Sequence, residues 1–117
     1  MIRDGLLVFR EPNRLHPLLP AILATSGIPI KSDSVKFTEI GLEADARPTA
    51  TSWWGEKVEI RLHPDDGGTS VVEIRSDHHG PSFFKDHDNV ARIRHSFRRT
   101  MRTLGVTVAW VRPRLPN

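Results

Sequence analysis

The chain has 117 residues, of which 38% are hydrophobic and 26% are charged, and it contains no cysteine. This length suits one domain with one core, and the composition excludes a disordered, collagen-like or coiled-coil protein. The lack of cysteine excludes disulfides, thiol catalysis and cysteine-ligated zinc. We therefore expect a single domain spanning residues 1–117.

The formal net charge is +3, but the charges are unevenly distributed along the chain. Residues 1–84 contain nine Lys/Arg and twelve Asp/Glu, whereas residues 85–117 contain eight and two. The last third is therefore strongly basic. No stretch approaches the roughly 18 apolar residues that a membrane-spanning helix needs. Arg3 and Asp4 also interrupt the region where a signal peptide carries its apolar run, so we expect a cytoplasmic protein.

The first two expected elements are a short strand and a helix. Residues 5–10 contain the apolar run Leu-Leu-Val-Phe, and the turn formers Glu-Pro-Asn at 11–13 follow it. A helix is expected at residues 17–24, because proline is tolerated in the first helical turn. Gly27 then supplies the glycine that commonly follows a helix.

Residues 35–46 alternate between apolar and polar side chains, as a half-buried strand does. The expected inward side chains are those of Ile40, Leu42 and Ala44. Gly41 lies between two of them and is a candidate for a β-bulge. We therefore expect one strand that bends near its centre.

Two further strands are expected to form an antiparallel hairpin. Residues 56–62 and 72–76 both alternate, and the turn formers of residues 63–68 connect them. On the solvated face, we expect ion pairs between the two strands. The expected inward residues are Val58, Ile60 and Leu62 in the first strand and Val72, Ile74 and Ser76 in the second, and the expected pairing residues are Glu59, Arg61, Glu73 and Arg75.

The second helix is the most clearly patterned element of the sequence. Its apolar residues recur at spacings of 3, 4, 4 and 3, which places them on one helical stripe. Asp86 or Asp88 is expected to cap its start, and Gly105 is expected to end it. Residues 106–110 then alternate as a last strand. The residues of the apolar stripe are Val90, Ile93, Phe97, Met101 and Leu104.

The expected order of elements is therefore β-α-β-β-β-α-β. Strands that follow one another as hairpins, with the helices segregated from them, are typical of the α+β class. We predict a single antiparallel sheet with two helices on one face.

Three short motifs follow one another in the middle of the sequence. They are the strand Ser52-Trp53-Trp54-Gly55-Glu56-Lys57-Val58, the strand Val72-Glu73-Ile74-Arg75-Ser76 and the helix start Asn89-Val90-Ala91-Arg92-Ile93. In this order they resemble a group of small uncharacterised bacterial α+β domains. In those domains a Ser-Trp-Gly-Glu-Lys strand precedes a second strand and an Asn-capped helix. The resemblance covers roughly residues 35–95 in order and spacing. It implies a bacterial domain of unknown function and identifies no catalytic residue.

The face of the second helix opposite the apolar stripe is basic. Its cationic side chains lie within about 120° of the helical circumference. No acid follows Asp88, and a guanidinium group can bind phosphate or carboxylate oxygens in a fork. This pattern indicates an anion-binding surface, and the alternative is an ordinary solvated face. The candidate binding residues are Arg92, His95, Arg98, Arg99, Arg102 and Arg112.

Three histidines near the start of this helix are candidates for a metal site. His78, His79 and His87 lie close to aspartates that supply oxygen ligands. Adjacent residues of a strand point to opposite faces, however, so His78 and His79 are poorly placed to share one ion. We therefore expect no metal or other cofactor, and regard a metal-dependent hydrolase as the least favoured alternative.

Trp53 and Trp54 offer a further alternative, in which the sheet and one indole ring bind a small apolar ligand. The competing interpretation is that one ring anchors the core and the other is incidentally exposed. A Ser-His-Asp triad is not indicated, because the sequence contains no nucleophile elbow.

We interpret the chain as a non-enzymatic binding domain whose basic C-terminal helix contacts nucleic acid or an acidic protein. A cavity between sheet and helices would favour the small-ligand alternative, whereas a well-filled interior would favour the basic helix.

Overall fold

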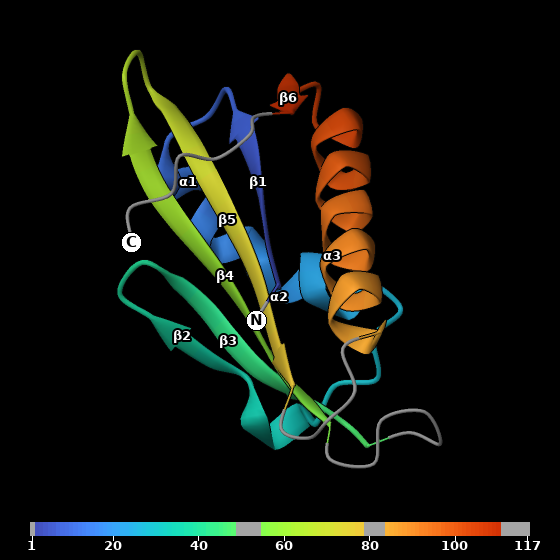
Figure 1. Cartoon of the computed structure of the whole chain (residues 1–117). Helices are drawn as coiled ribbons and strands as arrows, with labels where there is room; N and C mark the ends of the chain where they lie inside the picture. Colours follow the sequence, from blue (N-terminus) through green and yellow to red (C-terminus); the bar gives the residue numbers. More distant parts are fainter. Residues whose placement is uncertain (1, 49–54, 79–83, 111–117) are drawn as a thin grey trace.

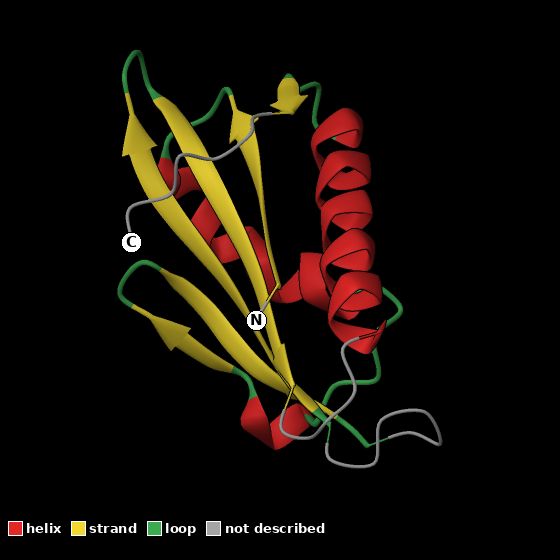
Figure 2. Ribbon diagram, viewed as in Figure 1, coloured by secondary structure: helices red, strands yellow, loops and turns green. Residues whose placement is uncertain are grey.

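The computed structural model describes residues 2–48, 55–78 and 84–110. These residues form one open antiparallel sheet with the strand order β2-β3-β4-β5-β1-β6 (Figure 1). The helices pack against one face of the sheet, where α2 contacts α3 (Figure 2). The predicted α+β class and antiparallel sheet are therefore confirmed. The strands are β1 (Ile2–Val8), β2 (Lys36–Thr38), β3 (Gly41–Ala46), β4 (Glu56–Asp65), β5 (Thr69–His78) and β6 (Val108–Trp110), and the helices are α1 (Pro12–Leu15), the 3₁₀ turn η1 (His16–Leu18), α2 (Leu19–Ala24), the 3₁₀ turn η2 (Ser32–Ser34) and α3 (Phe84–Thr103).

Prolines divide the first helical region into short pieces. Pro12, Pro17 and Pro20 each lie in the first two positions of α1, η1 and α2 respectively. Proline has no backbone N–H, so it fits the first turn of a helix and interrupts a longer one. The expected turn at residues 11–13 was therefore wrong, and the expected helix at 17–24 is the second part of a broken helical segment.

Residues 35–46 form two strands where we expected one. β2 and β3 pair as a hairpin, and Ile40 lies in the turn between them with 44% of its surface exposed. Leu42 and Ala44 are buried as predicted. The expected bulge at Gly41 was also wrong, because the pairing of β3 with β4 is continuous. A Cβ atom at Gly41 would lie 1.8 Å from the Ile60 carbonyl oxygen, so the close approach of β4 explains the glycine.

The hairpin of β4 and β5 is confirmed, and both strands are longer than the sequence indicated. The turn uses Gly67 and Gly68, both with φ of +73°, a region that favours glycine. All six predicted inward side chains of these two strands are buried. The period-two pattern of these two strands therefore predicted correctly which of their side chains face the core.

The opposite face of the sheet carries charged residues that bind one another. Glu59 lies opposite Arg75 and Arg61 lies opposite Glu73, in the predicted register. Arg75 contacts Glu59 at 3.6 Å and Glu73 at 3.4 Å, and Arg61 donates to Glu59 at 2.8 Å. The hydrogen bond from Arg61 to the Glu59 carboxylate raises the pKa of Arg61. Much of the charge on this face is thus neutralised within the protein.

Helix α3 covers the inner face of β5 and β1. Val90, Ile93, Phe97 and Met101 are buried, as the apolar stripe predicted. Leu104 is 45% exposed because the helix ends one residue before it. With the strand residues and the N-terminal helical segment, these side chains form one buried apolar cluster between sheet and helices.

Candidate functional site

The arginines of α3 fall into two groups according to their contacts. Arg92 and Arg99 face the end of α2 and the turn that follows it, where backbone carbonyls lack intrahelical partners. Arg92 donates to the Gly27 carbonyl at 3.4 Å and to the Asp88 carboxylate at 2.9 Å. Arg99 donates to the Thr25 carbonyl at 2.9 Å. These two arginines therefore fasten α3 to the end of α2.

Arg94 lies on the other flank of the helix and forms an ion pair with Asp4 of β1. Arg94 is not one of the predicted anion-binding residues. The pair joins α3 to the sheet, because Asp4 lies on the inner side of β1, opposite Ile74 in register. The positive charge of Arg94 is therefore paired within the protein.

The remaining cationic side chains of the predicted face are those of His95, Arg98 and Arg102, and all three are exposed. Within the described part of the chain, they make no hydrogen bond and no ion pair. Arg98 and Arg102 are four residues apart, so they are neighbours on the helix surface about 6 Å apart along its axis. Among the predicted anion-binding residues that the structure describes, those without such contacts therefore lie on the second half of α3. Arg112 lies outside the described residues.

The first half of α3 contains a buried polar network that the sequence pattern did not predict. The hydroxyl of Ser76 donates to Asp86 Oδ1 at 2.6 Å, and His78 Nδ1 lies 2.7 Å from Asp86 Oδ2. The side-chain amide of Asn89 donates to the Ser76 hydroxyl at 3.3 Å and to the Glu56 carboxylate at 3.0 Å. Ser76, Asp86 and Asn89 are fully buried.

This network is organised around the Asp86 carboxylate, which an imidazole and a hydroxyl both contact. Ser76 donates to Asp86 and not to His78, so the arrangement differs from a catalytic triad, in which the base accepts from the nucleophile. Ser76 is also fully buried, so a substrate has no access to its oxygen. The network therefore joins β4, β5 and the start of α3.

The expected capping role of Asp86 and Asp88 was wrong, because α3 begins at Phe84 and both residues lie inside it. Asp86 points inward into the network, whereas Asp88 forms an i,i+4 ion pair with Arg92. Helical periodicity explains this difference, since residues two apart on a helix face different directions.

The structure does not bring the candidate metal ligands together within the described residues. His78 binds Asp86, whereas His87 is exposed on α3. Among the residues that the structure describes, no group of three or more His, Asp or Glu side chains is arranged to hold a metal ion. His79 and the pair Trp53 and Trp54 lie outside those residues.

Comparison with known proteins adds no relative, since neither a protein-family model nor a curated protein matches the chain. The resemblance to small bacterial domains therefore stays a prediction. Among the described helices, none is long and apolar enough to span a bilayer.

Proposed function

We propose that the outer face of α3 binds the phosphate backbone of nucleic acid. The observation that supports this function is the contrast among the arginines of the helix. Arg98 and Arg102 are exposed and make no ion pair within the described residues, whereas Arg92 and Arg94 each contact a carboxylate. Two adjacent guanidinium groups with free donors suit the tetrahedral oxygens of phosphate.

The surrounding residues add to this surface. His95 is exposed on the same face, and Arg99 uses one guanidinium nitrogen for the Thr25 carbonyl. Arg99 retains further N–H donors, since guanidinium carries five. The contacts of Arg92, Arg94 and Arg99 hold α3 in place against α2 and β1. Arg98 and Arg102 therefore project from a helix whose position is fixed.

The interior of the described residues favours this function over the small-ligand alternative. One contiguous cluster of buried apolar side chains occupies the space between sheet and helices. A groove is present at the edge of the sheet, and its described lining residues come mainly from the N-terminal helical segment, the β2–β3 turn and β4.

The test is the salt dependence of nucleic-acid binding by the unmodified protein and by a double variant, Arg98→Gln with Arg102→Gln. Phosphate contacts release counterions, so log K falls with log salt by roughly 0.9 per contact on duplex DNA. We expect the double variant to lose about two units of that slope and to weaken binding to all sequences similarly. Fluorescence anisotropy with a labelled duplex measures both quantities.

Arg14→Gln is the matched control, because Arg14 is exposed on α1 and its replacement removes the same kind of charge. Its slope should remain that of the unmodified protein. The proposal fails if the unmodified protein binds neither single-stranded nor duplex nucleic acid near 50 mM salt. Binding to acidic protein under the same conditions would then identify the other class of anionic partner.

A further inference from the structure

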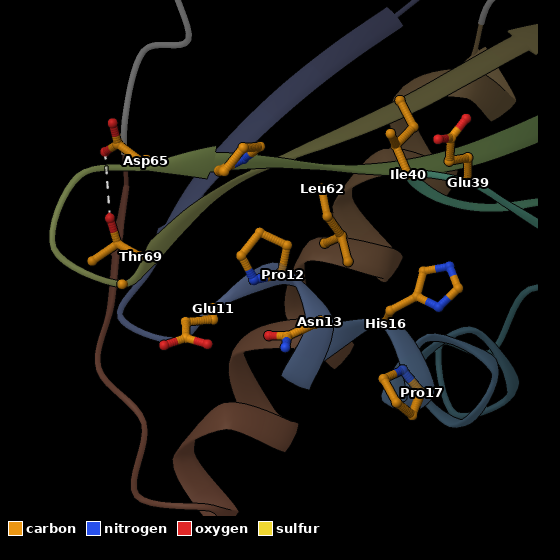
Figure 3. A pocket seen from close by; sticks show the side chains of 12 residues that line it. Glu11, Pro12, Asn13, His16, Pro17, Glu39, Ile40, Leu62, Asp65 and Thr69 are labelled. Carbon is orange, nitrogen blue, oxygen red and sulfur yellow. Dashed lines mark hydrogen bonds between the residues drawn. The ribbon is translucent and has the colours of Figure 1, made fainter.

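A groove of about 700 Å³ lies at the edge of the sheet, between the N-terminal helical segment and the ends of the neighbouring strands (Figure 3). One wall comes from the N-terminal helical segment, and the other comes from the β2–β3 turn, β4 and the β4–β5 turn. The residues of the helical wall are Glu11, Pro12, Asn13, His16 and Pro17. Its volume falls in the range of ordinary ligand sites. None of the α3 arginines lines it.

The walls of the groove are partly apolar and are held in a fixed position. Pro12, Pro17, Ile40 and Leu62 contribute apolar surface. His16 Nε2 lies 3.0 Å from the Thr38 carbonyl oxygen and 3.1 Å from that of Gly41. Carbonyl oxygens only accept hydrogen bonds, so Nε2 carries the hydrogen and ties the helical wall to the β2–β3 hairpin. The groove is therefore built into the fold.

The rim of the groove is acidic. Glu11 and Asp65 lie at the end near the β4–β5 turn, and Glu39 lies at the other end (Figure 3). No lysine or arginine is among the described residues that line the groove. Within the described part of the chain, the Glu11 and Glu39 carboxylates make no ion pair. This acidic rim is complementary to a cationic ligand.

Exposed apolar side chains extend from the groove along the edge of the sheet. Ile40 is 44% exposed, and Phe37 of β2 is 55% exposed with its ring centroid 4.8 Å from that of His16. Such a surface is not needed by a compact inorganic or polyamine cation. It suits a chain that alternates cationic with apolar side chains, because both kinds of surface are then covered.

We propose that this groove binds an extended cationic peptide segment of a partner protein. Arginine or lysine side chains of the segment contact Glu11 and Asp65 at one end and Glu39 at the other. Apolar side chains between them pack on Pro12, Pro17 and Ile40. The proposal is independent of nucleic-acid binding, since the groove and the outer face of α3 share no residue.

The test uses the full chain and a fluorescent synthetic peptide that repeats arginine, proline and leucine. We expect binding at about 50 mM salt that weakens as salt rises. Glu11→Gln combined with Glu39→Gln should weaken binding about three- to tenfold, the range for two exposed charge pairs. Ile40→Ser should weaken it about fivefold through lost apolar contact.

Two controls separate this site from other charged surfaces. Asp33→Asn removes an exposed carboxylate outside the groove and should leave peptide affinity unchanged. Arg98→Gln with Arg102→Gln should also leave it unchanged, so failure of the nucleic-acid proposal does not affect this result. The proposal is overturned if the peptide does not bind, if the groove variants bind it normally, or if spermidine competes as well as the peptide does. It is also overturned if the unmodified protein dimerises and the groove variants prevent this, because the occupant would then be a second copy.

Discussion

The inward and outward sides of α3 both carry polar residues, but the two sides differ in whether these residues have partners within the described part of the chain. On the inward side, Asp86, Asn89 and Ser96 are fully buried and hydrogen-bonded to β4, β5 or α2. On the outward side, Arg98 and Arg102 are exposed and make no contact of this kind within the described residues. The inward residues are therefore committed to the fold, and the outward ones are available to a partner.

This difference has an energetic basis. A buried polar group costs free energy unless its hydrogen bonds are made, so the inward network stabilises α3 only when it is intact. An exposed arginine is hydrated and contributes little to stability. Charge alone is thus a poor guide to a binding surface, because several arginines of α3 are used to hold the helix.

The largest expected effect tests which side of α3 faces the core. Phe97 is fully buried, so Phe97→Ala should lower the free energy of unfolding by about 3–5 kcal/mol. Urea denaturation followed by circular dichroism measures this loss. A loss below about 1 kcal/mol would mean that the helix is oriented differently and that the outward face is misassigned.

The next effect separates Asp86 from Asp88, two residues away on the same helix. Asp86→Ala removes the acceptor of Ser76 and His78 and should cost about 2–4 kcal/mol. Asp88→Ala breaks an exposed i,i+4 pair with Arg92 and should cost less than about 1 kcal/mol. Equal losses from the two changes, measured by chemical denaturation, would contradict the inward network.

The smallest effect concerns the outward arginines. Arg98→Gln with Arg102→Gln should change the free energy of unfolding by less than about 0.5 kcal/mol, because neither residue has an intramolecular partner within the described part of the chain. Thermal denaturation in the absence of nucleic acid provides the comparison. A loss of about 2 kcal/mol or more would show that these residues serve the fold and would remove the basis for their proposed role.

Period-two and helical patterns predicted much of the fold. The inward residues of β4 and β5, the register of their charged pairs and the buried stripe of α3 apart from Leu104 were confirmed. The turn at Glu39 and Ile40 was missed because it contains no glycine or proline and continues the strand alternation. Helix α1 was missed because Glu-Pro-Asn at 11–13 is also typical of a turn, although proline fits the first turn of a helix as well.

The candidate site was predictable only in part. Helical periodicity placed Arg98 and Arg102 outward, but the contacts of Arg92 and Arg99 depend on where α2 ends in space. The buried network joins residues that are eight to 33 positions apart, so the local sequence pattern did not reveal it. A signal was present, because Asp86 and Asn89 lie seven and four residues before Ile93, on the inward side of α3.

The central claim is that a polyanion binds the outward side of α3. Backbone amide chemical shifts, recorded while a short DNA duplex is added at about 50 mM salt, locate the bound surface residue by residue. We expect the largest changes at residues 95–102, with smaller changes in the groove and in β4. Changes confined to the groove or to the charged face of the sheet, or no change at all, would contradict the claim.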